Sequence, residues 1–486
     1  MTAARIALHR IVLFGVAGAM STRLATLGLY PVMDTTEARY AEIARKMVEL
    51  GDWITPWHDY ATPFWGKPPL SIWLTAGSFR MFGESEFAAR LPHFLCALLV
   101  IALIWDWSRR RSPREAALAA GLLVGSALFF VAAAAVMTDM TLTLGTALAM
   151  RGFWLGLHGS DRERRRERWL LFLGLGIGLL AKGPVAMVFV GLPIAAWAIA
   201  TGAFTRILRS LPWLRGTLLM LLLTVPWYLA AEYRTPGFLE YFLIGEHWKR
   251  FLVPGWTGDL YGSAHAYPWG SVWLFAVVAC LPWSLILPLA AIAGRRGATH
   301  AAEPPDRALT LYLLLWGLTP CVFFSAARNI LWTYVLPGLP ALSLLGAIWL
   351  ARRFDFTRVA GVVAVGLWAM PIALCAFLVY LQHPGARDPG WAKALVADFL
   401  SQRANDESLL FLGNGSDSVA FYSKGHVTNV PDAARLALEL ARGPVFVAIR
   451  EDEFPALPAQ LKHRLTPVAH HGSVGLFRAA PAAETR

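Results

Sequence analysis

Blocks of apolar residues, each near the length that crosses a bilayer, recur along most of the chain. Roughly twenty mostly apolar residues span a membrane as a helix, because a backbone in lipid must satisfy its own hydrogen bonds. By this measure the sequence predicts about eleven membrane-spanning helices, at residues 8–30, 90–108, 115–136, 139–158, 168–181, 184–202, 214–231, 270–291, 309–327, 331–350 and 359–381. Only Lys182 and Gly183 separate the short block at 168–181 from the next. That pair predicts either a tight hairpin or one broken helix.

The loops between these blocks differ in charge. Arginines gather in alternate loops, in groups within residues 5–10, 109–114, 162–168, 206–215, 295–307 and 352–358. The short loops on the other side hold only Lys182 and Arg328. Short cytoplasmic loops carry the excess of Lys and Arg. The pattern therefore predicts a cytoplasmic N-terminus and, with an odd number of spans, an external C-terminus.

The tail after the last block has a different pattern. Apolar runs at 409–412 and 445–449 alternate with helical stretches near 391–403 and 432–442. Short strands that alternate with helices predict a small α/β domain. The tail contains no cluster of residues typical of an active site.

We therefore expect two domains. The first is a membrane domain at 1–381, which includes the external segments 31–90 and 232–269. The second is an external α/β domain at 382–486.

Composition agrees with a membrane protein. The 486 residues are 56% hydrophobic and 16% charged, and the mean hydropathy is +0.49, whereas soluble domains average about 25% charged residues. The net charge of +12 comes from loop arginines and not from one clustered basic face, so it does not indicate a nucleic-acid partner. The four cysteines have neither disulfide nor metal-ligand spacing.

The external segment 31–90 predicts two helices at the membrane surface. Residues 34–36 can cap an amphipathic helix that runs to Leu50, with Gly51 as its stop. A second helix follows Gly66-Lys67-Pro68-Pro69 and ends near Gly83. Because a helix N-terminus favours anions, this places Lys67 where an anion would bind. The ordinary alternative is a lysine that snorkels to the lipid headgroups.

Three charged residues, Asp34, Glu37 and Arg39, lie within about one helical turn after the first span. They fit either a helix cap with a surface ion pair or an active carboxylate, and both interpretations stay open. Asp139 lies at the external junction of two apolar blocks, and Lys182 lies at an equivalent junction. Capping explains Asp139, but a carboxylate at membrane depth is also a functional candidate.

The external segment 232–269 contains Glu246-His247 and Arg250, and later His265. Glu246 and His247 fit either a metal-ligand pair or an acid beside an anion clamp. No closed metal-ligand spacing is present, and lone histidines are commonly ordinary interfacial residues. Arg328 and Tyr334 return to the same side of the membrane.

Charged residues from distant segments thus share one side of the membrane. They are Lys67, Lys182, Arg250 and Arg328, together with Asp34, Asp139 and Glu246. We expect them to form a basic cavity at the outer face that suits an anionic, lipid-embedded substrate. A transporter would instead keep its ionisable groups near the midplane of the spans.

Motifs in the order found along residues 31–340 resemble the GT-C superfamily of glycosyltransferases, which use lipid-linked sugars. They are DTTEARYAEIA at 34–44, GDWITP at 51–56, KPPL at 67–70, TDM at 138–140, LAKGPV at 180–185, EHWKRF at 246–251 and TYVLP at 333–337. The likeness is greatest to bacterial aminoarabinose transferases that modify lipid A, which are related to protein O-mannosyltransferases.

The resemblance implies an α-helical polytopic membrane protein of the GT-C type, with about eleven transmembrane helices, periplasmic juxtamembrane helices and a small C-terminal periplasmic α/β domain. It implies transfer in the bacterial inner membrane. From the chemistry we expect a single displacement with inversion at the sugar carbon, and we expect the protein to be a monomer. The donor would be undecaprenyl phosphate carrying a sugar, with 4-amino-4-deoxy-L-arabinose as the first candidate. The acceptor would be lipid A or another membrane glycolipid at the periplasmic face.

The resemblance also assigns roles by motif. Asp34 is the principal catalytic carboxylate, and Asp139 is a second acid that supports the acceptor or sugar pocket. Lys67 and Arg250 hold the donor's phosphate, and Tyr334 lines that site. The substrate pocket further includes Glu37, Arg39, Tyr40, Lys182, Glu246, His247, His265 and Arg328.

One departure from the family concerns a metal. Many relatives have a glutamate immediately before the Lys-Pro-Pro motif, and there it is associated with a metal, whereas this chain has Gly66. The sequence therefore implies no certain cofactor and leaves metal binding open. Two other functions also stay open, a transporter or flippase of lipid-linked sugars and a transferase that acts on protein hydroxyls.

Overall fold

The computed structural model describes residues 3–253, 256–262, 267–294, 306–327, 329–383, 390–404 and 407–479. The chain forms two compact units. The first unit consists of Met1–Leu27, Asp52–Leu74 and Arg90–Leu374, and the second of Gly28–Gly51, Thr75–Ala89 and Cys375–Arg486. Three helices, α3 (Leu70–Phe82), α4 (Glu86–Arg109) and α19 (Ala369–Tyr380), pass from one unit into the other. The domain boundary expected at residue 381 stays a prediction.

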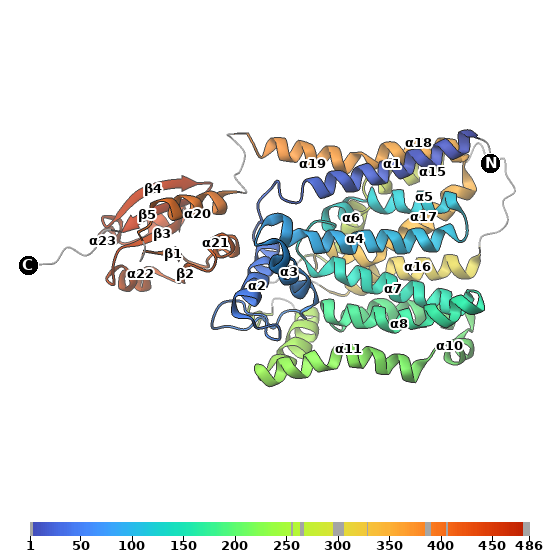
Figure 1. Ribbon diagram of the computed structural model, residues 1–486, viewed down its shortest axis with the longest axis horizontal. Helices are drawn as coiled ribbons and strands as arrows, with labels where there is room; N and C mark the ends of the chain where they lie inside the picture. Colours follow the sequence, from blue (N-terminus) through green and yellow to red (C-terminus); the bar gives the residue numbers. More distant parts are fainter. Residues whose placement is uncertain are drawn as a thin grey trace, which may run out of the picture. The chain divides into compact units, whose positions relative to one another are not determined.

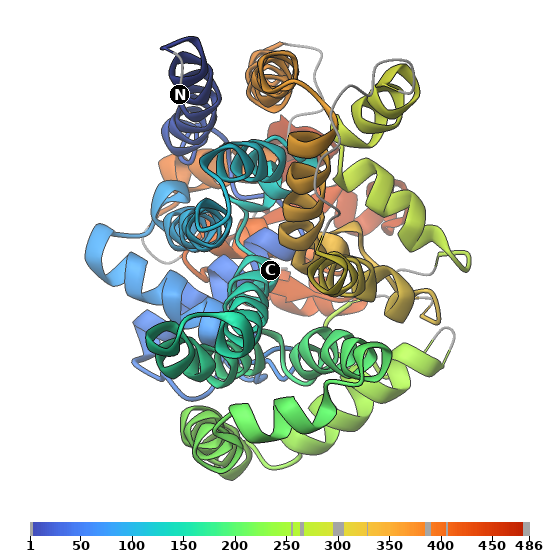
Figure 2. The same ribbon diagram turned by 90° about the vertical axis from the view of Figure 1, so that its right-hand side faces the viewer.

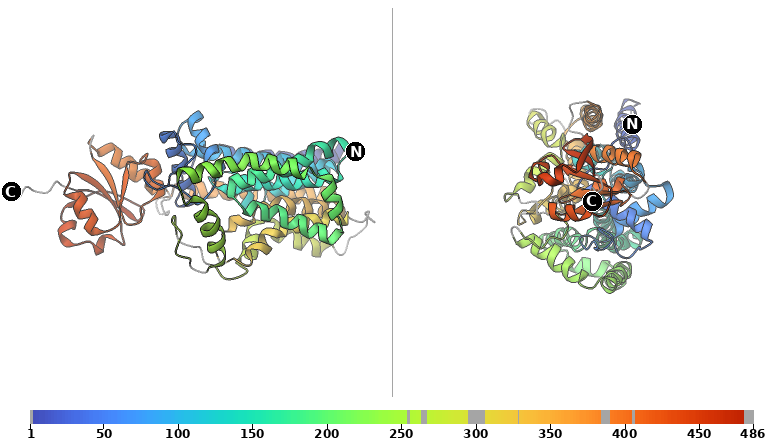
Figure 3. Two further views of the ribbon diagram at one scale, coloured as in Figure 1. Left: turned by 90° about the horizontal axis from the view of Figure 1, so that it is seen from below. Right: turned by 90° about the vertical axis from the view of Figure 1, so that its left-hand side faces the viewer.

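The first unit is helical. Besides its share of those three helices it contains α1 (Ala3–Ala25), α5 (Pro113–Val124), α6 (Ala127–Ala132), α7 (Thr138–His158), α8 (Asp161–Lys182), α9 (Val185–Thr201), α10 (Phe204–Ser210), α11 (Trp213–Arg234), α12 (Phe238–Glu240), the π-helix η1 (Tyr241–Lys249), α13 (Arg250–Leu252), α14 (Ser271–Ala279), α15 (Trp283–Gly294), α16 (Arg307–Phe324), the 3-10 helix η2 (Trp332–Gly338), α17 (Leu339–Arg353) and α18 (Phe356–Leu367). Helices α7, α8 and α11 run alongside one another (Figures 1 and 3), and several helices are seen end-on in Figure 2.

Glycines allow α7 and α8 to pack backbone against backbone. A Cβ on Gly145 would lie 2.7 Å from the nitrogen of Gly178, and a Cβ on Gly152 would lie 2.7 Å from the nitrogen of Leu171. Small residues let membrane helices approach this closely. The two helices are antiparallel with a short connection, so the start of α7 meets the end of α8. The break at Gly183, with φ of 81°, then separates α8 from α9, so the two predicted blocks are separate helices joined by a tight turn.

Five helical segments of the described residues are long and apolar enough to cross a membrane, namely Glu86–Arg109, Trp213–Arg234, Arg307–Phe324, Trp332–Arg353 and Val359–Tyr380. A sixth is obtained if the pair Ser271–Ala279 and Trp283–Ile292, bent by 84°, counts as one span. The chain is therefore a multi-pass membrane protein, but this count does not confirm the predicted eleven spans. Some predicted blocks are interrupted, as at Gly125–Ser126, which separates α5 from α6.

The second unit contains a five-stranded sheet with the order β2-β1-β3-β5-β4. Strands β1, β2 and β3 are parallel, whereas β5 runs antiparallel to β3 and β4. The elements are α2 (Thr36–Leu50), α20 (Trp391–Gln402), β1 (Ser408–Leu412), α21 (Asp417–Tyr422), β2 (Val427–Val430), α22 (Ala433–Leu440), β3 (Val445–Arg450), the 3-10 helix η3 (Phe454–Ala456), α23 (Ala459–Lys462), β4 (Leu465–His471) and β5 (Val474–Ala479). This confirms the predicted small α/β region.

Alternating apolar side chains place helices on both faces of the sheet. In β1, Leu409 and Phe411 pack in the cluster that includes α20 and α21, whereas Leu410 and Leu412 pack in the cluster that includes α22. Successive strand residues point to opposite faces, so a strand buried on both sides reads as a continuous apolar run. Figure 1 shows α20 and α22 beside the strands.

The two predicted surface helices have the predicted bounds. Helix α2 ends at Leu50, before Gly51 with φ of 65°, and α3 ends at Phe82, before Gly83 with φ of 79°. Positive φ favours glycine at such helix ends. The predicted cap is wrong, because the side chain of the N-cap residue, Thr35, makes no hydrogen bond to the first turn of α2. Asp34 instead binds residues of the C-terminal region, as described below.

Candidate functional site

Lys67 and Arg250 share one carboxylate, that of Glu246. The Lys67 ammonium donates to Glu246 Oε1 and, at 2.6 Å, to the carbonyl of Gly66. Arg250 Nη1 donates to Glu246 Oε1 at 2.8 Å and to Oε2 at 2.9 Å, and lies 3.3 Å from Asp259 Oδ2. The Glu246 side chain is only 6% exposed. The structure thus joins residues 179 positions apart into one ion-pair cluster.

Local structure fixes each member of this cluster. Lys67 precedes α3, and the Tyr261 hydroxyl secures the chain before it by donating to the carbonyl of Pro63 at 2.7 Å and accepting from the nitrogen of Trp65 at 2.9 Å. Glu246 lies in the π-helix η1, and Arg250 follows four residues later, a spacing at which helical side chains meet. π-Helical turns are frequent at functional sites.

The cluster shifts the pKa values of its members. Burial raises the pKa of Glu246, but the charges of Lys67 and Arg250 outweigh burial and hold it below the usual range for glutamate. Burial lowers the pKa of Arg250, but the Glu246 charge outweighs this and raises it. Both side chains are therefore charged at neutral pH.

A second ion pair joins Asp139 and Lys182. Asp139 lies in the first turn of α7 and Lys182 in the last turn of α8, and the Lys182 Nζ donates to Asp139 Oδ1 at 2.7 Å. The same ammonium lies 4.3 Å from the centre of the Tyr334 ring, a cation–π distance. Tyr334 is also within electrostatic reach of Lys67, Arg250, Asp139 and Glu246, so it connects the two clusters.

His247 packs at the turn between α8 and α9. Its Nδ1 lies 2.7 Å from the carbonyl oxygen of Phe242, and its Nε2 lies 3.3 Å from that of Lys182. Burial lowers the pKa of His247, which favours the neutral ring. Glycine is needed at 183, because φ is 81° and a Cβ would lie 2.5 Å from the Phe242 ring. His247 therefore supports the turn that carries Lys182.

The expected basic cavity stays a prediction, but its described cations are paired with acids. Among the residues that the structure describes here, the cations Lys67, Lys182 and Arg250 contact the acids Asp139, Glu246 and Asp259. The charges nearly balance, because an ion buried in a membrane protein requires a partner. An anionic ligand must therefore engage cations that already have carboxylate partners.

The remaining predicted residues on α2 lie in the second unit. Arg39 Nε pairs with Asp417 Oδ2 at 3.2 Å. The exposed Asp34 accepts hydrogen bonds from Ser416 Oγ at 2.6 Å and from the nitrogen of Ser418 at 2.8 Å. Glu37 is half-buried and Tyr40 is buried on the same helix. His265 and Arg328 lie outside the described residues.

Sequence reasoning missed Asp259 and the loop Ser416–Ser418. Asp259 lies in the external segment that supplied Glu246, so its position among the candidate cations could have indicated it. The loop gave no signal, because its serines look like an ordinary helix start. Ser416 does cap α21, accepting from the nitrogen of Val419.

The described residues around Lys67 lack the ligand set of a metal site. Gly66 offers no ligand, and a Cβ there would lie 2.9 Å from the Phe64 ring. Within the described ranges, no group of three or more His, Cys, Asp and Glu side chains is arranged to hold a metal ion. The Glu246 carboxylate is already shared by two cations.

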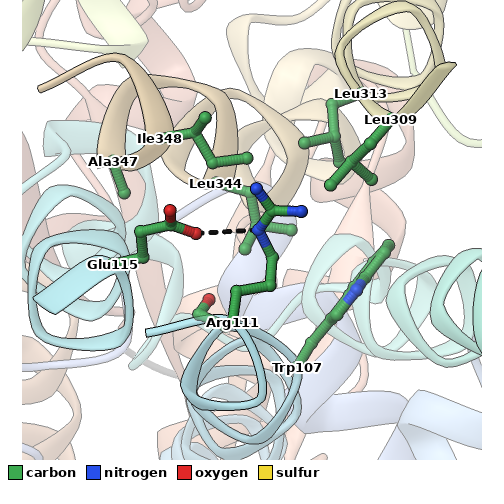
Figure 4. Close-up of a pocket in the computed structure, with 9 residues that line it drawn as sticks. Trp107, Arg111, Glu115, Leu309, Leu313, Leu344, Ala347 and Ile348 are labelled. Carbon is green, nitrogen blue, oxygen red and sulfur yellow. Dashed lines mark hydrogen bonds and ion pairs between the residues drawn. The ribbon is translucent and has the colours of Figure 1, made fainter. Parts of the chain in front are cut away.

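The helical unit also contains two hollows. A large apolar groove of about 1030 Å³ is lined by residues of α5 and of α14 to α17, among them Trp273, Val277, Cys280, Leu339 and Arg352. A second hollow, of about 10 Å³, lies beside the ion pair of Arg111 and Glu115 (Figure 4). This space admits at most one water, so of these two hollows in the described chain the groove has the size of a ligand site.

Solved structures identify the fold. The crystal structure of ArnT from Cupriavidus metallidurans bound to undecaprenyl phosphate matches with a TM-score of 0.80 at 22% identity, covering 97% of this chain and 98% of that one. Its apo form matches with a TM-score of 0.78 at 23% identity, covering 97% and 99%. The apo oligosaccharyltransferase of Archaeoglobus fulgidus matches with 0.52 at 11% identity, covering 91% and 70%. The chain therefore shares the fold of these structures.

Sequence comparisons give a family model and individual relatives that match this chain. The family model of dolichyl-phosphate-mannose-protein mannosyltransferases matches residues 7–242. The undecaprenyl phosphate-alpha-4-amino-4-deoxy-L-arabinose arabinosyl transferase of Pseudomonas aeruginosa strain UCBPP-PA14 is 31% identical over 360 residues, which is 71% of this chain and 61% of that relative. The Pseudomonas paraeruginosa PA7 enzyme of that name is 32% identical with the same coverage.

The chain therefore spans about three-fifths of the length of these curated relatives. It is similar to the aminoarabinose transferases, and residues 7–242 match the family model of the O-mannosyltransferases. The resemblance predicted from the motifs is confirmed.

Proposed function

We propose that this protein is an inverting glycosyltransferase that moves a sugar from undecaprenyl phosphate to lipid A or to another glycolipid. The first candidate sugar is 4-amino-4-deoxy-L-arabinose, after the activity named for the bacterial relatives. The protein would act as a monomer in the bacterial inner membrane with about eleven spans. Its site and its C-terminal α/β domain, residues 382–486, would face the periplasm.

The observation that carries this proposal is the sharing of Glu246 by Lys67 and Arg250. Arg250 donates to Glu246 through Nη1, which is also the atom paired with Asp259, and in the described chain Nε and Nη2 donate no hydrogen bond to an acid. A guanidinium can bind a phosphate with two parallel hydrogen bonds. The Lys67 ammonium has three donors, of which Glu246 and Gly66 take two. Both cations thus keep donors for a phosphate.

Lys67 and Arg250 would then stabilise the leaving group. Breaking the bond between the sugar carbon and the phosphate oxygen leaves that oxygen with the bonding electrons, so negative charge develops on the polyprenyl phosphate. Fixed cations in a site with little water stabilise such charge. Glu246 holds the two cations together before the donor binds, and Tyr334 lines the same site.

The acceptor side would use Asp34 and Asp139. If the acceptor is an ionised lipid A phosphate, it attacks the sugar carbon directly, and Asp34 stabilises the oxocarbenium-like sugar. If the acceptor is a hydroxyl, Asp34 takes its proton as a general base. Asp139, paired with Lys182, supports the sugar or acceptor pocket, to which we also assign Glu37, Arg39, Tyr40, His247, His265 and Arg328.

The apolar groove suits the donor's polyprenyl chain. It reaches Leu339, which directly follows η2, the short helix that carries Tyr334. A lipid whose phosphate lies beside Tyr334 could therefore extend its tail into the groove. Burial of apolar surface would supply much of the donor's affinity.

Mass spectrometry of lipid A tests the proposal. Cells that lack their own aminoarabinose transferase but make the lipid-linked sugar should gain sugar-modified lipid A when they express this chain. Lys67→Ala and Arg250→Ala should abolish the modification, whereas Lys249→Ala, a matched change at an exposed lysine of the same segment, should keep it.

Two outcomes would favour the alternatives. Lipid-linked sugar that crosses proteoliposome membranes without transfer would indicate a flippase. Sugar found on periplasmic protein and not on glycolipid would indicate a transferase for protein hydroxyls.

A further inference from the structure

We propose that the loop Ser416–Ser418 of the C-terminal region positions the Asp34 carboxylate for reaction. The inference rests on the proposed function, in which Asp34 is catalytic. Ser416 Oγ donates to Asp34 Oδ2 at 2.6 Å, and the nitrogen of Ser418 donates to Oδ1 at 2.8 Å. With both oxygens held, the carboxylate is fixed in orientation.

Neighbouring contacts hold the loop against the segment that carries Asp34. On one side, Arg39 of α2 pairs with Asp417. On the other side, Ser418 Oγ donates to the carbonyl of Val32 at 3.2 Å. All these residues belong to one compact unit, so the arrangement does not depend on how the two units are placed.

Helix α21 adds a second point of attachment. The Tyr422 hydroxyl accepts from the nitrogen of Val32 at 2.7 Å and donates to Glu86 Oε1 at 3.1 Å. Glu86 in turn accepts from Lys393 of α20 at 2.6 Å. The segment before Asp34 is therefore held at both ends of α21, which limits its movement relative to the loop.

Helix capping does not account for the contact with Asp34. Ser416 already caps α21 by accepting from the nitrogen of Val419 at 3.1 Å, and this needs only its oxygen. The cap does not use the hydroxyl proton of Ser416, which is donated to Asp34. Asp34 is also exposed, so burial does not force its carboxylate to find these donors.

The two donors hydrogen-bond to both oxygens of the Asp34 carboxylate, an arrangement that suits its ionised form. This suits an Asp34 that stabilises positive charge on the sugar more than one that must accept a proton, because a general base works with a free lone pair. Precise placement matters, since a displacement of about 1 Å can cost about a hundredfold in rate. Ser416 is therefore a positioning residue.

Steady-state kinetics of purified full-length variants in lipid vesicles test the inference. Ser416→Ala should lower kcat by about tenfold or more with little change in the KM for the lipid-linked donor, and Ser416→Thr, which restores the hydroxyl, should recover most of the loss. Ser416→Asp keeps an oxygen that caps α21 but has no proton to donate, so it should fail like alanine. Ser423→Ala, at the other end of α21, controls for damage to the helix.

A double mutant separates positioning from general stability. If Ser416 acts through Asp34, adding Ser416→Ala to Asp34→Asn should lower the residual rate no further. Wild-type kcat in Ser416→Ala or in Ser416→Asp, together with an inactive Asp34→Asn, would overturn the inference and leave the proposed function intact. Wild-type turnover in Asp34→Asn would overturn the catalytic role of Asp34 itself, and the inference with it.

Discussion

Lys182 and Asp139 face each other across the antiparallel helices α7 and α8, with the ammonium 2.7 Å from the carboxylate. The side chains are 11% and 8% exposed, so neither charge is well solvated. Removing one partner of a buried pair leaves an uncompensated charge and costs about 3–5 kcal/mol. Asp139→Ala and Lys182→Ala should therefore each lower the thermal midpoint of the purified protein.

The double variant Asp139→Asn/Lys182→Met should recover part of that loss, because no unpaired charge remains. Thermal unfolding followed by tryptophan fluorescence measures all of these variants. If the thermal midpoint of the double variant falls by the sum of the two single losses, the two side chains do not act as a pair.

The α7 and α8 backbones meet at Gly174, which offers a direct test of the helix packing. A Cβ there would lie 2.5 Å from the nitrogen of Ala149 and from the carbonyl oxygen of Gly145. Gly174→Ala should thus separate the helices and lower the thermal midpoint. Gly191→Ala on α9 is the matched control, since nothing lies within 4 Å of its Cβ, and alanine there should stabilise the helix slightly. Equal midpoints for the two variants would contradict this packing.

The direction of the Glu246 pKa shift predicts how stability depends on pH. An unfolded glutamate has a pKa of about 4.3, and the ion pairs lower the pKa of Glu246 in the folded protein. The ion pairs of Glu246 therefore stabilise the folded protein fully above about pH 4.3. This stabilisation is lost as the pH falls through the pKa of Glu246 in the folded protein.

The thermal midpoint of the wild type should exceed that of Glu246→Gln by a nearly constant amount between about pH 6 and pH 8. The difference should shrink as the pH is lowered towards about 4 and below. A difference that grows on acidification would contradict the assigned ion pairs.

The apolar groove makes a prediction about donor length. Val277 lines the groove, whereas the neighbouring Val278, also exposed, does not. Val277→Trp should fill part of the groove and raise the KM for a long-chain donor by about tenfold, with a smaller effect on a donor with a short prenyl chain. Val278→Trp is the control and should leave both KM values unchanged. An equal effect of Val277→Trp on both donors would exclude the groove as the site of the tail.

Local parts of this molecule could be predicted from the sequence. The bounds of α2 and α3 follow from Gly51 and Gly83, and the apolar runs of β1 and β3 indicate strands buried on both faces. These features depend only on residues that are close in the sequence, so the local sequence pattern is enough to predict them.

Long-range pairings could not be predicted in the same way. Glu246 could be recognised as a candidate acid, but nothing near it in the sequence shows that it neutralises Lys67. Asp34 fits a helix cap when its neighbours alone are considered, yet its partners lie more than 380 residues away. The break at Gly125–Ser126 also escaped prediction, because both residues are tolerated inside apolar helices.

Binding of undecaprenyl phosphate to the purified protein tests the central claim most directly. The account predicts that Lys67→Ala and Arg250→Ala each weaken binding by about tenfold or more, the value of one charge-assisted hydrogen bond, whereas Lys249→Ala binds like the wild type. Unchanged affinity in both Lys67→Ala and Arg250→Ala would show that the two cations sharing Glu246 do not hold the donor's phosphate.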